Sequence, residues 1–220
     1  IMPAKERINM TNPSTVSKTN VSTSAKNNQS IADLFRSITL QEWLTAAVIG
    51  AALGVAYFGF TMLYEVVKPF LKPLGLKYLT SGLWILAPVL LGNMVRKPGV
   101  ALFASVLAAV VQGTYSEWGM TASLLYGTLQ GAAVELVFLA FLYRKWSFAV
   151  LSFAASLSAT CSYAYDYYLS DRNLSFAFNL IQWAGFVVSA IVLAAWLTQY
   201  LSARLLKTGL MDTFLIARKP

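Results

Sequence analysis

The stretch that decides the fold is residues 84–111, WILAPVLLGNMVRKPGVALFASVLAAVV. It consists of two apolar runs joined by the short basic turn RKPG at 96–99. Apolar runs separated by short basic loops are typical of membrane helices, and the basic loops lie on the cytoplasmic side. We therefore predict that the chain spans a membrane and that this turn lies at the cytoplasmic edge.

The composition of the 220-residue chain also indicates a membrane protein. Hydrophobic residues make up 57% of the chain and charged residues 12%, whereas a soluble domain carries about 25% charged residues. The mean hydropathy is +0.60. The formal net charge of +8 could indicate a nucleic-acid partner. We reject that partner because the basic residues lie in the N-terminal tail and in short loops, the pattern that orients helices in a bilayer.

The residue inventory excludes several kinds of chemistry. The chain has no histidine and one cysteine, Cys161, which lies within an apolar run. Serine–histidine triads and HExxH zinc sites are therefore excluded, and neither a disulfide nor a cysteine-based metal site is expected within the chain. The sequence contains no G-x-x-x-x-G-K-[ST] motif, so any ATP would be used by a partner. We expect no enzyme activity, no catalytic residues, no metal site and no cofactor.

We predict an all-α membrane protein with six spans. The spans run over about 42–66, 81–95, 100–115, 121–143, 147–169 and 176–205. A straight span needs about 20 apolar residues. The second and third spans are shorter, so we expect them to extend, to tilt or to be sheltered by neighbouring helices. In the outer loop 68–81 we expect Pro69 and Pro73 to prevent a regular helix. This loop forms either a mobile lid or an ordinary interfacial loop.

The distribution of charge predicts the orientation of the chain. Thirteen of the 17 basic residues lie in the N-terminal tail, in two short loops at 96–97 and 144–145, and after residue 203. Both termini are therefore expected in the cytoplasm, with the helices in the cell membrane.

The remaining regions complete the domain organisation. Residues 1–30 are rich in Thr, Ser, Asn and Lys and are expected to be disordered. We interpret residues 1–9 as a tag remnant before a candidate native start at Met10. The apolar spacing in 31–41 predicts an amphipathic helix at the membrane interface. It precedes the six-helix membrane domain at 42–209, which a cytoplasmic tail at 210–220 follows.

Small residues recur every four positions in the first span. They are Ala46, Gly50 and Gly54, then Ala47 and Ala51, and then Ala52 and Ala56. Small residues at this spacing let another helix approach closely. That helix belongs either to the same chain or to a partner subunit.

Polar residues within the spans are candidates for function. Gln112 and Glu135 lie inside apolar runs, and Glu135 either contacts a polar ligand or forms a structural hydrogen bond between helices. Aromatic and amide side chains gather in the outer halves of the helices. They are Trp84, Tyr126, Gln130, Tyr163, Tyr167, Asn179, Gln182 and Trp183. An unpaired amide in an apolar medium costs about 4–8 kcal/mol. We therefore predict a cavity that opens outward and binds a small molecule through these residues.

Four segments of the chain carry a family resemblance: APVLLGNMVRKPGVALFASVLAAVV at 87–111, SEWG at 116–119, LQGAAVE at 129–135 and YD at 165–166. They resemble the S component, the substrate-binding subunit of energy-coupling factor (ECF) vitamin transporters. The branch they resemble takes up thiamin and its hydroxymethylpyrimidine precursor, and the resemblance covers about 43–209. It implies a six-helix protein that captures a vitamin from outside and delivers it through a coupling subunit powered by two cytoplasmic ATPases. It also implies docking on that subunit through Ala47, Ala51, Ala52 and Ala56.

The resemblance leaves the vitamin open. In the thiamin branch, acidic residues occupy the positions held here by Ser105 and Gln112, and they favour the cationic thiazolium ring. Their loss suits a larger, amide-rich ligand, and the chain more closely resembles the cobalamin-specific S component of lactobacilli. We therefore expect cobalamin as the substrate, with thiamin or hydroxymethylpyrimidine as the alternative. A self-sufficient secondary transporter is the rival class, although such carriers usually hold several intramembrane charges and internal repeats.

Overall fold

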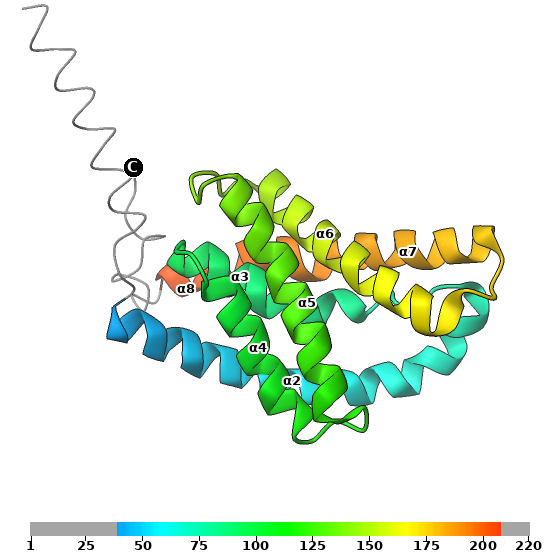
Figure 1. Ribbon diagram of the computed structural model, residues 1–220. Helices are drawn as coiled ribbons and strands as arrows, with labels where there is room; N and C mark the ends of the chain where they lie inside the picture. Colours follow the sequence, from blue (N-terminus) through cyan, green and yellow to red (C-terminus); the bar gives the residue numbers. More distant parts are fainter. Residues whose placement is uncertain (1–38, 208–220) are drawn as a thin grey trace, which may run out of the picture. The chain divides into compact units, whose positions relative to one another are not determined.

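The computed structural model describes residues 39–207, and every regular element in that range is helical. The elements in chain order (Figure 1) are α2 (Leu40–Leu71), η1 (Lys72–Leu74), η2 (Ser81–Ile85), α3 (Leu86–Val95), α4 (Val100–Gly113), α5 (Gly119–Ala140), α6 (Phe148–Asp166), η3 (Tyr167–Asp171), α7 (Phe176–Ala190), η4 (Ile191–Trp196) and α8 (Leu197–Lys207). The all-α fold class predicted from the sequence is confirmed.

Four helical segments are long and apolar enough to cross a membrane. They are Leu40–Leu74, Gly119–Ala140, Phe148–Asp171 and Phe176–Lys207. Two shorter apolar helices, Ser81–Val95 and Val100–Gly113, lie between the first and second of these segments in the chain. Each of the six predicted spans thus coincides with a helical segment of a multi-pass membrane protein.

The shortest span is sheltered by its neighbours. All ten residues of α3 are buried, and the helix packs against α2, α4, α5 and α8. Because its backbone hydrogen bonds and its side chains are enclosed by protein, α3 does not need the length of a helix that faces lipid along its whole course.

The first span is longer than predicted. It begins at the capping box formed by Thr39 and Glu42, continues past Pro69 and ends at Leu71. The expectation that Pro69 prevents a regular helix was therefore wrong. A proline this close to a helix end removes one backbone hydrogen bond and can be accommodated by a bend. Figure 1 shows the cyan end of α2 turning away from the direction of its blue start.

The rest of the outer loop forms short turns. Lys72–Leu74 make the 3₁₀ turn η1, and Gly75 ends it in a left-handed conformation with φ of 72°, which glycine adopts at little cost. The predicted interfacial helix falls mostly outside the described residues, as do the two terminal tails.

Close helix packing in the bundle depends on small residues. Gly54 of α2 lies against α4, where an added Cβ would approach the carbonyl oxygen of Ala108 to 2.7 Å. Gly127 of α5 lies against the same helix, where a Cβ would lie 2.4 Å from that of Ala109. These contacts hold α2 and α5 close to α4, and a cavity lies among these three helices.

Candidate functional site

A cavity of about 520 Å³ is enclosed by α2, α4, α5, α6 and the segment from η1 to η2. Phe186 of α7 also contributes to its wall. Its volume lies within the range of about 300–1,000 Å³ that is usual for small-molecule sites. Its lining consists of an aromatic wall, a set of uncharged polar groups and several charged groups.

The aromatic wall is built by three rings from separate elements. Tyr64 of α2 contacts Trp84 of η2 and Trp118, which precedes α5, with ring centroids 5.4 and 5.8 Å apart. The two tryptophan rings lie 5.6 Å from each other. Glu65 accepts a hydrogen bond of 3.2 Å from the indole nitrogen of Trp118. This contact fixes the ring against α2. The rings meet edge to face or at a tilt, with interplanar angles of 83°, 86° and 52°, so they form an apolar wall whose ring faces point in different directions.

The uncharged polar groups come from α4, α5 and α6. Gln112 donates a hydrogen bond of 3.0 Å to the hydroxyl of Thr61, and Gln130 lies one helix away on α5. The hydroxyls of Ser123 and Ser162 and the indole nitrogen of Trp84 are buried and have no partner among residues 39–207. Buried polar groups are nearly always hydrogen-bonded, so these three are available to a ligand or to water.

The charged groups lie where η1, η2 and η3 meet the cavity. The ammonium of Lys77 lies 2.8 and 3.0 Å from the two carboxylate oxygens of Asp171. The hydroxyl of Tyr78 lies 3.4 Å from Asp171. Burial raises the pKa of Tyr78 well above its usual value, and the nearby charges of Asp166 and Asp171 add to this effect. Tyr78 is therefore a neutral donor at physiological pH.

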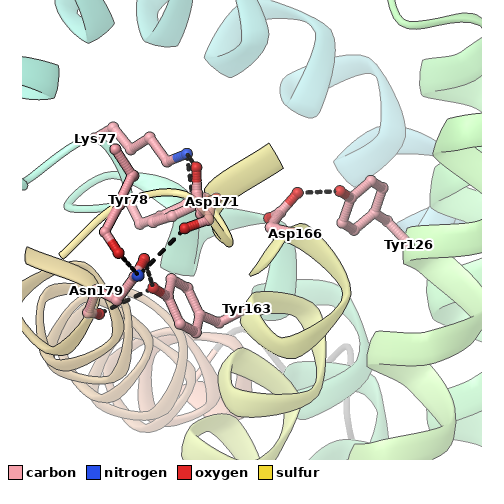
Figure 2. A network of polar contacts seen from close by, with 8 residues as sticks. Lys77, Tyr78, Tyr126, Tyr163, Asp166, Asp171 and Asn179 are labelled. Carbon is pink, nitrogen blue, oxygen red and sulfur yellow. Dashed lines mark hydrogen bonds and ion pairs between the residues drawn. The ribbon is translucent and has the colours of Figure 1, made fainter. Parts of the chain in front are cut away.

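Asp166 ends α6 and lines the same cavity. The hydroxyl of Tyr126, on α5, donates a hydrogen bond to its carboxylate. Figure 2 shows this carboxylate pointing towards Tyr126, with the Lys77–Asp171 pair on its other side. Asp166 was not among the residues chosen from the sequence. The signal that could have identified it is its membership of the Tyr165-Asp166 segment that carries the family resemblance.

The remaining polar residues of this region fix the backbone at Asp171 through hydrogen bonds. The hydroxyl of Tyr163 donates to the side-chain oxygen of Asn179 over 2.9 Å, and the Asn179 amide donates to the backbone oxygens of Asp171 and Leu174. Figure 2 shows these contacts. They hold η3 at the start of α7, and so they position the carboxylate of Asp171 at the cavity.

The structure divides the predicted binding residues into three groups. Trp84, Tyr126 and Gln130 line the 520 Å³ cavity, together with Gln112. Tyr163, Tyr167, Asn179 and Trp183 line a second, more open pocket of about 360 Å³. Gln182 lines neither pocket. Its side chain is buried, and its amide has no hydrogen-bond partner among the described residues.

Glu135 makes a structural contact. Its carboxylate accepts hydrogen bonds from the backbone nitrogens of Gly99 (2.6 Å), Ala101 (3.0 Å) and Leu102 (3.2 Å) at the start of α4. It also accepts one from the hydroxyl of Tyr143. A carboxylate at a helix N-terminus satisfies free N–H groups and interacts favourably with the helix dipole. The structure thus places Glu135 as a cap that joins α5 to α4, away from the cavity.

The small residues of α2 occupy two different faces. Ala46, Gly50 and Gly54 are buried against α4. The residues predicted to dock a partner lie on a less buried part of the helix: Ala52 is exposed, and Ala47, Ala51 and Ala56 are partly exposed. Large apolar side chains, including Val48 and Val55, are exposed beside them.

A helical membrane bundle with a ligand-sized cavity is suited to binding a small molecule within a membrane. A family model described as the permease component of an ABC-type cobalt transport system matches residues 41–161, and the chain belongs to this family. It is also similar to YkoE of Bacillus subtilis (strain 168), whose name describes an HMP/thiamine permease. The two are 28% identical over 185 residues, which cover 84% of this chain and 92% of the relative.

Among solved structures, the chain is similar to a crystal structure of an S-component of an ECF transporter. The TM-score is 0.78 at 28% identity, with 82% of this chain and 92% of that chain covered. The resemblance to S components is thereby confirmed: the protein is an ECF transporter S component, which associates with other components of that transporter and is not an enzyme.

Proposed function

We propose that this S component binds thiamin or its hydroxymethylpyrimidine precursor in the 520 Å³ cavity. The observation that carries this proposal is the size and chemistry of that cavity, which combines an aromatic wall with amide and hydroxyl groups. The similarity to a relative named as an HMP/thiamine permease supports the same vitamin. Together they favour the alternative that we named from the sequence over cobalamin, which is several times larger than thiamin.

The argument that led towards cobalamin rested on a family resemblance and on the absence of acidic residues in the third span. Ser105 and Gln112 do line the cavity, and α4 contributes no carboxylate to it. The helix α6, however, brings Asp166 to the same cavity. The lack of acidic residues at 105 and 112 therefore does not deprive the site of negative charge.

The chemistry of the pyrimidine ring fits the remaining lining. The rings of Trp84 and Trp118 offer surfaces on which a flat heteroaromatic ring can stack. Gln112 and Gln130 carry both donors and acceptors, which match the ring nitrogens and the amino group of the pyrimidine. The unpartnered serine hydroxyls provide further hydrogen bonds.

The proposal includes the partners of the subunit. Delivery of the vitamin requires a transmembrane coupling subunit and two ATPases, and the exposed part of α2 around Ala52 is the docking face. Ala47, Ala51 and Ala56 lie on the same part of the helix, and their small side chains would let a partner helix approach closely. The positions of both termini in the cytoplasm remain part of this proposal.

Calorimetric titration of the purified protein in detergent tests the ligand. Thiamin, hydroxymethylpyrimidine and cobalamin are titrated separately at pH 7.5. Saturable binding of thiamin or hydroxymethylpyrimidine without a cobalamin signal supports the proposal. Saturable binding of cobalamin alone overturns the proposal and supports cobalamin, the ligand that we expected from the sequence.

A further inference from the structure

Arg96 is a partly buried cation without an anionic partner in the described part of the chain. Its Nε donates a hydrogen bond of 3.1 Å to the backbone oxygen of Asn93, and its guanidinium lies 5.2 Å from the centre of the Trp146 ring. No carboxylate lies within 4.0 Å of it among residues 39–207. Burial lowers the pKa of Arg96, whereas a neighbouring carboxylate would raise it. The guanidinium is therefore withdrawn from water without a counter-charge.

The turn between α5 and α6 adds two more cations. Arg144 and Lys145 directly precede Trp146 in the chain, and both are exposed. The indole nitrogen of Trp146 donates a hydrogen bond of 3.0 Å to the backbone oxygen of Tyr143, which fixes the ring beside Arg96. We call the three cations and this ring (Arg96, Arg144, Lys145 and Trp146) the basic corner.

The backbone of the basic corner adopts an uncommon conformation. In the described part of the chain, the non-glycine residues with positive φ are Arg96 (57°), Leu142 (51°) and Tyr143 (53°). Left-handed conformations cost free energy for such residues, and they are enriched at functional sites. All three residues lie in the two turns that the Trp146 ring connects.

The acidic residues of this region do not neutralise the basic corner. Lys97, the other cation of the basic turn, is paired with Glu42. The carboxylate of Glu135 accepts hydrogen bonds from backbone nitrogens at the start of α4 and from the hydroxyl of Tyr143. It forms no ion pair within 4.0 Å in residues 39–207. An ionised Glu135 offsets the charge of at most one of the three cations, so the corner keeps an excess of positive charge.

Exposed apolar side chains adjoin these cations. Leu142 is 55% exposed and lies two residues before Arg144, and Phe148 is 41% exposed and lies two residues after Trp146. They flank the junction of α5 and α6, two helices that are long and apolar enough to cross a membrane. A soluble anion would use the cations alone. A molecule with a negative headgroup and an acyl chain would use the cations and the apolar side chains together.

We infer that the basic corner binds the phosphate headgroup of an anionic phospholipid, whose acyl chains lie along Leu142 and Phe148. A guanidinium can donate two parallel hydrogen bonds to phosphate oxygens, and basic sites between membrane helices recognise anionic headgroups. Tryptophan is enriched at the level of the headgroups. In the orientation that we propose, the lipid belongs to the cytoplasmic leaflet.

This lipid site is separate from the vitamin site. No residue of the basic corner lines the 520 Å³ cavity. The inference therefore does not depend on which vitamin the protein binds, and the variants below should leave vitamin affinity unchanged. A failure of the lipid site and a failure of the proposed function are thus distinguishable.

Native mass spectrometry of the purified protein in detergent tests the inference. The protein is titrated with phosphatidylglycerol, which is anionic, and separately with phosphatidylcholine, which is zwitterionic. We expect the wild-type protein to bind phosphatidylglycerol more tightly. In Arg96→Gln the affinity for phosphatidylglycerol should fall about tenfold or more, because one partner of a partly buried charge pair is lost. The affinity for phosphatidylcholine should change less than about twofold.

A second variant keeps the test independent of folding. Arg96 also bonds to the backbone of α3, so its substitution can affect folding. The double variant Arg144→Gln/Lys145→Gln changes only exposed side chains. It should lower the affinity for phosphatidylglycerol as well, by about threefold or more, because two charges at the rim are lost. No loss in either variant would overturn the inference.

A matched control separates a specific site from general attraction between cations and anionic lipids. Arg204 of α8 is exposed, and its guanidinium lies 5.1 Å from the centre of the Tyr200 ring. Arg204→Gln therefore removes the same charge and the same kind of ring contact away from the junction of α5 and α6. Its affinity for phosphatidylglycerol should stay within about twofold of the wild type. An equal loss in Arg96→Gln and Arg204→Gln would show general attraction only and would overturn the site.

Three other results would also overturn the inference. Equal affinity of the wild-type protein for the two lipids would show that the headgroup is not recognised. Binding of glycerol phosphate as tight as that of phosphatidylglycerol would assign the corner to a soluble anion. Loss of co-purification with the other transporter components in Arg144→Gln/Lys145→Gln, with lipid affinity unchanged, would assign it to a protein partner.

Discussion

Glu42, in the first turn of α2, and Lys97, in the turn between α3 and α4, form a buried ion pair with a nitrogen–oxygen distance of 2.5 Å. Glu42 also accepts hydrogen bonds from the backbone nitrogen and the hydroxyl of Thr39. One carboxylate therefore caps α2 and also ties its start to the basic turn at 96–99. The turn that marks the edge of the membrane in the sequence is thus a structural junction of the bundle.

Replacing Lys97 with methionine should destabilise the protein strongly. The substitution leaves the Glu42 carboxylate buried without its cation, and breaking a buried pair in this way costs about 3–5 kcal/mol. The measurement is thermal unfolding in detergent, with the exposed Lys145→Met as the control. Equal unfolding temperatures for both variants would contradict this interpretation.

The packing of α2 on α4 predicts opposite effects for two glycines of one helix. In Gly54→Ala the new methyl group would lie 2.7 Å from the Ala108 carbonyl oxygen, whereas a methyl group at Gly59 meets nothing within 4 Å. Overpacking costs about 1–3 kcal/mol, and replacing an exposed helical glycine with alanine gains about 0.5–1 kcal/mol. Thermal unfolding should therefore show a loss for Gly54→Ala and no loss for Gly59→Ala. A loss of the same size in both would exclude close packing as the cause.

The exposed part of α2 predicts the effect of a bulky residue on assembly. Ala52→Trp should prevent co-purification with the coupling subunit, because a large ring blocks the close approach of a partner helix. Ligand binding should be unchanged, since Ala52 does not line the cavity. The control is Leu136→Trp, which places the same ring at an exposed position on α5. Normal co-purification of Ala52→Trp would move the docking face elsewhere.

The two pockets predict different effects for substitutions in their linings. Gln130→Ala removes an amide from the 520 Å³ cavity and should lower the affinity for the ligand about tenfold. Trp183→Ala alters the second pocket, where the indole nitrogen donates to Thr160 over 3.1 Å. Its affinity should stay within about twofold of the wild type. Calorimetric titration measures both, and the reverse ranking would place the ligand in the second pocket.

The family resemblance identified the class of protein. The identity of the vitamin, however, could not be inferred from the residues of one helix. The part of the sequence-based argument that concerned charge considered only Ser105 and Gln112, both in α4. The cavity also receives Asp166 from α6, Lys68 from the last turn of α2, and Lys72 and Lys77 from the segment that follows α2. The charge of a site is the sum over all the helices that meet there, so a substitution in one helix does not determine it.

Glu135 illustrates the same difficulty for a single residue. The sequence predicts either a ligand contact or a structural hydrogen bond for Glu135, because a carboxylate can make both. Its partners are backbone nitrogens of Gly99, Ala101 and Leu102, at least 33 residues earlier in the chain. Only the packing of α5 against α4 brings those nitrogens within reach.

The sequence by itself determined the membrane class and the helical nature of the six predicted segments. These properties are local, because a bilayer requires apolar helical segments and each segment carries its own hydropathy. Tertiary structure decided which side chains share the cavity. Tyr126 and Asp166 are 40 residues apart, and Lys77 and Asp171 are 94 residues apart. Each of these pairs forms because close helix packing brings distant segments together, and that packing depends on many weak contacts at once.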